Sequence, residues 1–264
     1  MPSLRLPVTY QRTCADPGIP TEERHFLRPT LQHAYPVEQT ALVLVDCWDN
    51  HYIKSHERRS AEIMRTTLKP VIEALRGVGV AIVHAPSPPQ AKKYPAWTRF
   101  AGPREVGMPK PPSLAADWPP EDFRKRQGDY EPFAKPKEPV LEEYYQIIDQ
   151  RRILPDIEPV EGDFVVASGE QLHRLLRHQQ ILHLLYAGFA TNMCILYRDY
   201  GTRAMAARGY NVVLLRDCTL GIEGAETDAQ SRLTEAAIRM IEQQTGFSTT
   251  SEAVLEACQA VGEA

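Results

Sequence analysis

Short runs of apolar residues alternate along the chain with segments of helical periodicity. The runs at 41–46 (ALVLVD) and 79–85 (GVAIVHA) are apolar at nearly every position, and the segment between them, 58–79, places apolar residues three and four positions apart. Continuous apolar runs are typical of strands buried on both faces, and the wider spacing is typical of an amphipathic helix. This part of the chain therefore predicts a strand, a helix and a second strand.

The same alternation returns in the C-terminal half of the chain. We expect strands at 163–167, 182–188 and 210–217 and helices at 170–181, 192–208, 226–244 and 251–260. Strands that are apolar on both faces belong to a parallel sheet, because the helices that connect such strands cover its two faces. The pattern therefore predicts an α/β fold of three layers, α/β/α, around a doubly wound and mainly parallel sheet.

The segment 86–160 interrupts this alternation. It contains 15 of the 22 prolines, with aromatic residues such as Trp97, Trp118 and Tyr144 between them. Proline enrichment is also typical of a disordered linker, but disordered segments are poor in aromatic residues. We expect an ordered insertion over the carboxyl ends of the strands, where open α/β sheets bind ligands. With an N-terminal extension at 1–37, the chain is then a single domain over 1–264.

Composition and charge narrow the class of partner. The net charge is −4 and the longest basic run is RKR at 124–126, so we expect neither a nucleic acid nor a membrane as partner. The sequence shows no signal peptide and no apolar run of membrane-spanning length, which makes the cytoplasm the expected location. Five widely spaced cysteines without a Cys-x-x-Cys pair indicate reduced thiols.

Two side chains that can carry chemistry come after predicted strands. Asp46 closes the first strand at the rim where ligands bind, with a turn or helix-capping aspartate as the alternative. Cys194 comes after the strand at 182–188, in the first turn of the next predicted helix. The helix dipole and the free amides there lower the pKa of a thiol and can hold an oxyanion. A lone cysteine is equally often a small buried hydrophobic residue, so the residues around Cys194 are needed to distinguish the two interpretations.

Four segments in chain order carry a resemblance to a known family. They are ALVLVDCWD, ILPDIEPVEGDFVV, YAGFATNMC and RGYNVVLLRDCTLG. They resemble the isochorismatase-like hydrolase superfamily, the α/β cysteine hydrolases that include nicotinamidases and N-carbamoylsarcosine amidohydrolases. The resemblance covers roughly residues 38–85 and 150–255.

The resemblance implies a role for four residues. It implies that Cys194 is the nucleophile and Asp46 the general base. It also implies a cis peptide bond between Phe189 and Ala190, which turns backbone amides, including that of Cys194, toward the oxyanion.

The sequence departs from the family at the third residue of the catalytic triad. The family's lysine ends a D-x-v-v-x-K pattern, and here the pattern Asp163–Ser168 ends in serine; the segment after Cys194 is also a few residues longer than usual. Arg198, one helical turn after Cys194, could supply the positive charge, although an arginine does not exchange protons near neutral pH. Glu170 could supply a second carboxylate. A solvated helix residue is the alternative for both, and insertion lysines are further candidates: Lys92, Lys93, Lys125, Lys135 and Lys137.

Three further residues are candidates for substrate binding. Trp48 and His51 come after the first strand, and His84 lies at the end of the second. Nicotinamidases of the superfamily hold a divalent ion with an aspartate and two histidines, but only His84 stands in the corresponding segment here. Asp49 and His51 do not complete a ligand set. We therefore expect no metal and no other cofactor.

Together these features predict a cysteine-dependent hydrolase of a C–N amide or carbamoyl bond in a small molecule, acting through a thioester. The alternative is a catalytically inactive relative that binds a ligand or supports an assembly, which the missing lysine favours. A third possibility is hydrolysis of a vinyl ether without a nucleophile, as in isochorismatases proper, and Cys194 argues against it. We also expect a homo-oligomer, a dimer or larger, because the superfamily is commonly oligomeric and the insertion offers apolar surface.

Overall fold

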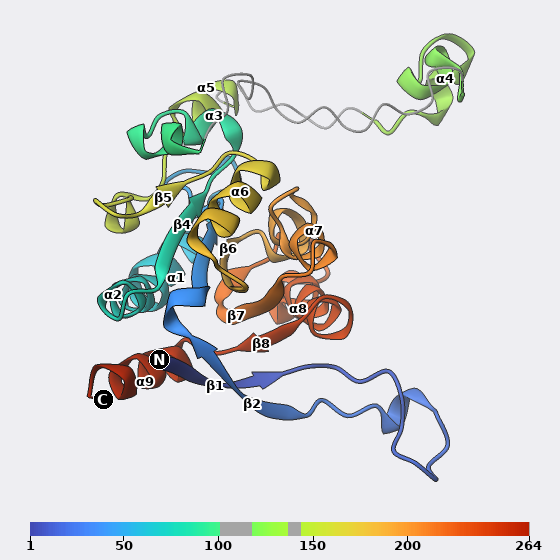
Figure 1. The fold of residues 1–264 in the computed structure, drawn as a ribbon. Helices are drawn as coiled ribbons and strands as arrows, with labels where there is room; N and C mark the ends of the chain where they lie inside the picture. The colour runs from blue at the N-terminus through green and yellow to red at the C-terminus, as the bar shows by residue number, and fades with distance from the viewer. Residues whose placement is uncertain (101–117, 137–143, 264) are drawn as a thin grey trace.

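Eight strands form a mixed sheet in the computed structural model, which describes residues 1–100, 118–136 and 144–263 (Figure 1). The strands are β1 (Ser3–Thr9), β2 (Thr30–Pro36), β3 (Thr40–Val45), β4 (Ala81–Ala85), β5 (Phe164–Val165), β6 (His183–Phe189), β7 (Asn211–Leu220) and β8 (Phe247–Thr249). Their order is β2-β1-β8-β7-β6-β3-β4-β5, and the six strands from β8 to β5 are parallel. The predicted mainly parallel, doubly wound α/β sheet is therefore confirmed.

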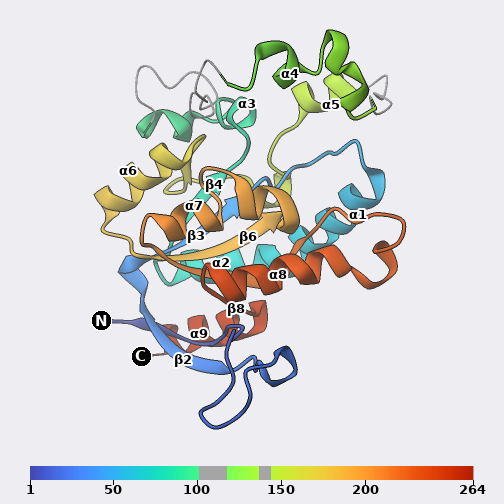
Figure 2. The ribbon, with the colours of Figure 1, turned by 90° about the vertical axis from the view of Figure 1, so that its right-hand side faces the viewer.

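Helices cover both faces of this sheet, as Figures 1 and 2 show. One face carries α1 (Lys54–Ile63), a π-helical turn (Met64–Leu68), α2 (Lys69–Gly77) and α9 (Ser251–Gly262). The other face carries α6 (Gly169–Gln179), α7 (Thr202–Ala207) and α8 (Arg232–Gln244). Leu42 and Leu44 of β3 pack into the first core and Val43 and Val45 into the second, because successive strand residues point to opposite faces. Two apolar layers explain why β3 is apolar at every position from Ala41 to Val45.

No helix in the described part of the chain has the length and hydrophobicity needed to cross a lipid bilayer.

Short helices occupy the described parts of the proline-rich insertion. They are α3 (Pro88–Ala91), α4 (Glu121–Lys125), α5 (Tyr144–Gln150) and 3-10 turns at Pro95–Arg99, Gly128–Phe133 and Pro155–Ile157. α3 and α5 lie together beyond the carboxyl end of β4 (Figure 1), where Gln90 donates a hydrogen bond to the carbonyl of Ile148 at 3.0 Å. Residues 101–117 and 137–143 of the expected insertion, Lys137 included, lie outside the described residues.

The N-terminal residues form a β-hairpin that joins the sheet. The sequence analysis expects an extension at 1–37 but no strands in it. β1 pairs antiparallel with β2 along its whole length and with β8 at Thr9 and Ser248. Leu4, Leu6 and Val8 are fully buried in the core that also contains α9. Their alternation with outward residues is the period-two signal of a half-buried strand, so this element was readable from the sequence.

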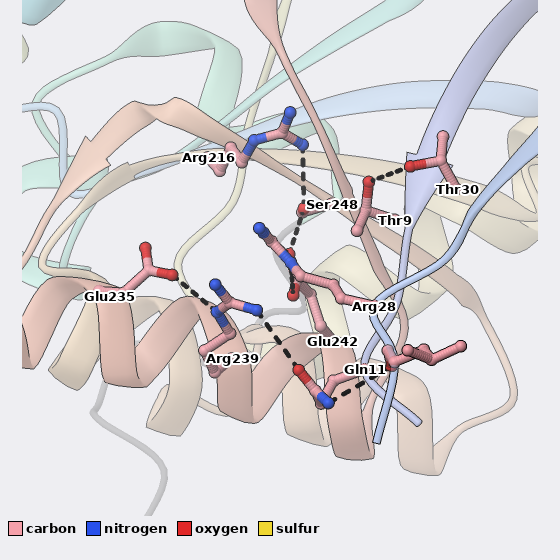
Figure 3. A network of polar contacts seen from close by, with 10 residues as sticks. Thr9, Gln11, Arg28, Thr30, Arg216, Glu235, Arg239, Glu242 and Ser248 are labelled. Carbon is pink, nitrogen blue, oxygen red and sulfur yellow. Dashed lines mark hydrogen bonds and ion pairs between the residues drawn. The ribbon is translucent and has the colours of Figure 1, made fainter. Parts of the chain in front are cut away.

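A buried carboxylate on α8 ties the hairpin loop to the sheet (Figure 3). The Glu242 side chain is fully buried, and its two oxygens accept hydrogen bonds from Arg28 at 2.5 and 2.7 Å. Ser248 Oγ donates to the same carboxylate at 2.5 Å and accepts from Arg216 at 3.2 Å. A carboxylate without solvent needs such partners, because burial of an unpaired charge costs several kcal/mol.

We expect Arg28→Met to lower the free energy of unfolding by about 2 kcal/mol, because it leaves the Glu242 carboxylate without its cation. Urea denaturation followed by circular dichroism measures this change. Arg232→Met is the matched control: Arg232 lies on the same helix, and its Nε donates to Gln230 in an exposed contact at 2.7 Å. Its effect should stay within about 0.5 kcal/mol, and equal effects of the two substitutions would contradict the account.

The continuous helix expected over 192–208 is wrong. A π-helical turn spans Thr191–Ile195, α7 begins only at Thr202, and the chain turns between them. Gly201 allows this turn, since a Cβ there would lie 2.7 Å from the carbonyl oxygen of Ile195. The turn sets the direction of Arg198, four residues after Cys194.

Candidate active site

Three strand ends meet where the order of the sheet reverses. β3 lies between β4 and β6, and the chain leaves these strands toward Asp46, Ser87 and Cys194, respectively. In a doubly wound sheet, the connections on the two sides of this point lead to opposite faces and leave a crevice at the carboxyl edge. The topology therefore gathers three polar side chains that are far apart in the sequence.

Asp46 is held by three side chains in a buried position. Its Oδ1 accepts a hydrogen bond from Ser87 Oγ at 3.2 Å and its Oδ2 accepts one from Arg198 Nη2 at 3.2 Å. The thiol of Cys194 lies close enough to the same carboxylate for each group to shift the pKa of the other. Asp46 is 1% exposed and has a φ of 47°, a left-handed conformation that is uncommon for a residue with a side chain.

Burial and the neighbouring groups act on the acidity of Asp46 in opposite directions. Burial raises its pKa, and the positive charge of Arg198 and the hydrogen bonds from Cys194, Arg198 and Ser87 oppose this rise; the net pKa is above its usual value. A carboxylate with a raised pKa in contact with a thiol is suited to take up and return a proton.

Arg198 lies beside Asp46 and supplies the positive charge there, the role for which it is a candidate from the sequence. Besides Asp46, its Nη2 contacts Ser87 Oγ at 2.6 Å, so one guanidinium joins the strand ends of β3, β4 and β6. Ser168, at the position where the resemblance implies a lysine, caps α6 by accepting a hydrogen bond from the Gln171 amide at 3.2 Å. The cation of this site thus comes from the turn after the cysteine.

The thiol of Cys194 has a raised pKa, not the lowered one expected from its place at a helix start. Burial raises its pKa to about 12, and the negative charge of Asp46 adds to this; Arg198 and the backbone amide of Ala190 act in the opposite direction. The helical turn that begins here is five residues long, so its dipole is small beside these effects. At neutral pH the thiol is protonated and must lose its proton before it can attack.

The turn before Cys194 contains the cis peptide bond that the resemblance implies, between Phe189 and Ala190. Gly188 precedes it with a φ of 114°, and a Cβ at this position would lie 2.0 Å from the carbonyl oxygen of Val45. Only glycine permits this approach of β6 to β3. The close contact brings the Ala190 amide to the Cys194 thiol.

An open hollow of about 490 Å³ gives access to the thiol. It is lined by Asn192, Met193, Cys194, Tyr197 and Arg198. Met193 and Tyr197 are largely exposed at its rim. Asn192 braces the turn by donating to the carbonyl of Ile222 at 2.8 Å and accepting from its amide at 3.0 Å. Cys194 and Arg198 thus line one and the same hollow.

Trp48 and His51, two predicted substrate-binding residues, lie in the loop after Asp46. The Trp48 amide donates to the carbonyl of Asp46 at 3.0 Å, and the rings of Trp48 and His51 stack with centroids 6.1 Å apart. Burial, and next the charge of His56, lower the pKa of His51 to about 3, so the imidazole is neutral near pH 7. Its Nδ1 accepts a hydrogen bond from the Ile53 amide at 3.0 Å.

His84 and Glu170 are placed differently from what the sequence analysis expects. His84 is 1% exposed and its Nε2 contacts Asp163 Oδ2 at 3.3 Å, in a buried group completed by Arg76. Glu170 lies at the surface and pairs with Arg208 at 3.2 Å. Among the residues that the structure describes, no contact joins either side chain to the Asp46–Cys194 pair. Each of the two side chains is held by partners of its own, His84 by Asp163 and Glu170 by Arg208.

Ser87 is a residue of this site that the sequence analysis does not name. It lies two residues past the end of β4, beside two prolines, and its hydroxyl joins Asp46 to Arg198. The signal was available, because every polar residue just past a parallel strand reaches the same edge of the sheet. Within residues 1–100, 118–136 and 144–263, no cluster of three or more His, Cys, Asp or Glu side chains is arranged to hold a metal ion.

Comparison with known proteins identifies the family. The sequence model of the Isochorismatase domain matches residues 40–253, and the chain therefore belongs to the isochorismatase-like hydrolases. No curated protein matches the chain.

Several solved structures have a similar fold. A cysteine hydrolase from Pseudomonas syringae pv. phaseolicola 1448A is 15% identical over 86% of this chain and 95% of that one, with a TM-score of 0.55. An isochorismatase family protein from Desulfovibrio vulgaris subsp. vulgaris str. Hildenborough is 14% identical over 84% and 98%, with a TM-score of 0.49. An N-carbamoylsarcosine amidase from Thermoplasma acidophilum is 14% identical over 81% and 97%, with a TM-score of 0.43. At these identities the likeness concerns the fold, and the first structure supports it.

Proposed function

We propose that this protein is a cysteine-dependent hydrolase that cleaves a C–N amide or carbamoyl bond of a small molecule through a thioester. One arrangement carries the proposal: Asp46 accepts a hydrogen bond from the Arg198 guanidinium at 3.2 Å, and the Asp46 carboxylate and the Cys194 thiol are near enough to shift each other's pKa. A nucleophile, a base within hydrogen-bonding distance and a fixed cation are the parts that acyl transfer requires.

In the first half of the reaction, Asp46 accepts the proton of the thiol while Cys194 Sγ attacks the carbonyl carbon. The amides of Ala190 and Cys194 stabilise the oxyanion of the tetrahedral intermediate. When the intermediate collapses, the C–N bond breaks and Asp46 returns the proton to the leaving nitrogen. Ammonia or an amine departs and the acyl group stays on the sulfur as a thioester.

In the second half, Asp46 accepts a proton from water as the water attacks the thioester, and the sulfur leaves with that proton as a thiol. The acid product departs and the starting state returns. Arg198 keeps its proton throughout, because a guanidinium does not titrate near neutral pH. Its part is electrostatic: it favours the anionic forms of Asp46 and Cys194 as each appears.

An ammonia-release screen over amides, ureas and N-carbamoyl amino acids tests this proposal. We expect release from at least one compound by the wild-type protein and none by Cys194→Ala. A panel without turnover, or turnover that survives Cys194→Ala, would contradict the proposal.

A catalytically inactive ligand-binding protein is the second candidate, and the side chain at position 168 favours it. Ser168 stands in place of the family's lysine and caps α6 instead of facing the thiol. This candidate predicts that compounds of the same panel raise the melting temperature without releasing ammonia. Stabilisation together with turnover would exclude it.

A further inference from the structure

Arg151 is fixed beside the loop that carries Asp46. Its guanidinium carbon lies 3.8 Å from the centroid of the Trp48 ring, and its Nε donates to the carbonyl of Asn50 at 3.1 Å. Trp48 in turn donates its amide to Asp46 and forms an antiparallel bridge with Ile153. The last residues of the insertion are thus paired with the loop that begins at the proposed general base.

The guanidinium of Arg151 is buried without a carboxylate of its own. Arg151 is 5% exposed, and its Nη2 has no hydrogen-bond partner in the described part of the chain. Burial lowers the pKa of Arg151, and Asp46 is the foremost charge that opposes this effect. Asp46 is already bound to Arg198, so one carboxylate faces two cations. Arginines are rarely buried unless paired, because desolvation of the charge is costly.

Unpartnered donors belong to Arg198, which binds Asp46, and to Trp48 and Arg151, which pack on each other in the segments beside it. Trp48 Nε1 and Arg198 Nε, like Arg151 Nη2, are buried and lack an acceptor among the described residues, and Asn50 Oδ1 is the one acceptor of this loop that lacks a donor there. A buried donor without an acceptor costs free energy, and a bound ligand can supply what the protein does not. An excess of N–H donors together with an excess of positive charge matches a ligand group that is anionic and rich in acceptor oxygens.

We propose that Arg151 binds a carboxylate of the substrate, so that the preferred substrates are amides or carbamoyl compounds that also carry a carboxylate. The planar guanidinium presents parallel N–H groups that fit the two oxygens of a carboxylate. The indole of Trp48 holds the guanidinium in place. This inference rests on the proposed function, since it names the substrate class of the same site.

Protection of Cys194 against alkylation tests the inference with a matched pair of ligands. Succinamate and succinamide have the same length and differ only in a carboxylate or a second carboxamide. The rate of iodoacetamide labelling at Cys194 is measured by peptide mass spectrometry at mildly alkaline pH, with the exposed Cys14 as internal reference. Each protection constant is a ratio of rates within one variant, so a changed reactivity of the thiol cancels.

We expect succinamate to protect wild-type Cys194 at about one tenth of the succinamide concentration or less, as one charge-assisted hydrogen bond allows. Arg151→Gln should make the two ligands equal. Arg152→Gln is the control with the same change of charge one residue away; Arg152 is about half exposed and pairs with Glu158. It should keep the wild-type preference.

Equal protection of the wild-type protein by both ligands, or no protection by succinamate at its solubility limit, overturns the inference. So does a preference that survives in Arg151→Gln. If that variant fails to fold, as circular dichroism shows, Arg151→Met decides: methionine keeps an apolar side chain against Trp48 but has no charge, and a preference that survives in it overturns the inference. Labelling of Cys194 without ligand, together with the ammonia screen, reports separately on the proposed function.

Discussion

Asp46→Asn and Cys194→Ala should each reduce ammonia release by about 10⁴-fold or more, the scale seen when a member of a nucleophile and base pair is removed. Asparagine keeps the shape of Asp46 and its contact with Arg198 but cannot take the thiol proton. Alanine removes the nucleophile. The measurement is turnover of whichever compound the ammonia screen identifies, with circular dichroism to show that both variants are folded.

Alkylation of Cys194 separates these two residues further, because Asp46→Asn should speed it while abolishing turnover. The negative charge of Asp46 and its hydrogen bond to the thiol both raise the Cys194 pKa, which stands at about 12. Their loss lowers that pKa, so the thiolate fraction and the labelling rate rise at any pH below it. In the wild-type protein, the rate should climb with pH through the neutral range without reaching a plateau.

Glu170→Gln is the matched control for Asp46→Asn, since it is the same change of carboxylate to amide. Glu170 is exposed and pairs with Arg208, and loss of a surface ion pair costs at most about 1 kcal/mol of stability. Turnover and labelling should stay within about twofold of wild type. A large loss of turnover in Glu170→Gln, or turnover retained by Asp46→Asn, would contradict the assignment of Asp46 as the base of this site.

The residues that could be predicted from the sequence are those whose position is set by a strand end. Asp46 comes directly after β3 and Cys194 five residues after β6, and parallel strands bring the residues past their carboxyl ends to one edge of the sheet. The layers of the fold were predictable for a similar reason: β3 is apolar at every position from Ala41 to Val45, which requires cover on both faces.

The rest depends on tertiary packing. His84 lies inside β4, one residue before its end, whereas Asp46 lies just past β3, and the His84 side chain is buried against Asp163 beside Arg76. Arg198 was predicted to lie near Cys194 because the two residues are one helical turn apart in sequence. In the structure the helix is interrupted, and a turn before α7 directs Arg198 toward Asp46. Arg151 leaves no local signal at all, because it meets the loop after β3 only through the pairing of segments about 100 residues apart.

The two segments that depart from the family pattern, the one at Ser168 and the one after Cys194, pack against each other in the structure. Their contact explains how a cation reaches the site without the lysine. Gly169 comes directly after Ser168, and a Cβ there would lie 1.9 Å from the carbonyl oxygen of Asp199. The Gly169 amide donates to the Asp199 side chain at 2.8 Å. The turn that carries Arg198 therefore packs against the start of α6, and the small residues at 168–169 make room for it.

Arg198→Gln should lower turnover by about 10²-fold, because it removes the fixed charge that favours the anions of Asp46 and Cys194. It should also slow labelling of Cys194 at neutral pH, since Arg198 opposes the rise of the thiol pKa and its loss lets that pKa rise further. Arg198→Lys keeps the positive charge on a shorter side chain and should retain part of the turnover and part of the labelling rate.

Arg203→Gln is the control. Arg203 lies over the Tyr197 ring at 5.5 Å and does not line the hollow beside Cys194, so its replacement should leave turnover and labelling unchanged. If Arg198→Gln also leaves both unchanged, the cation that replaces the family's lysine is another residue, and the assignment of Arg198 is wrong.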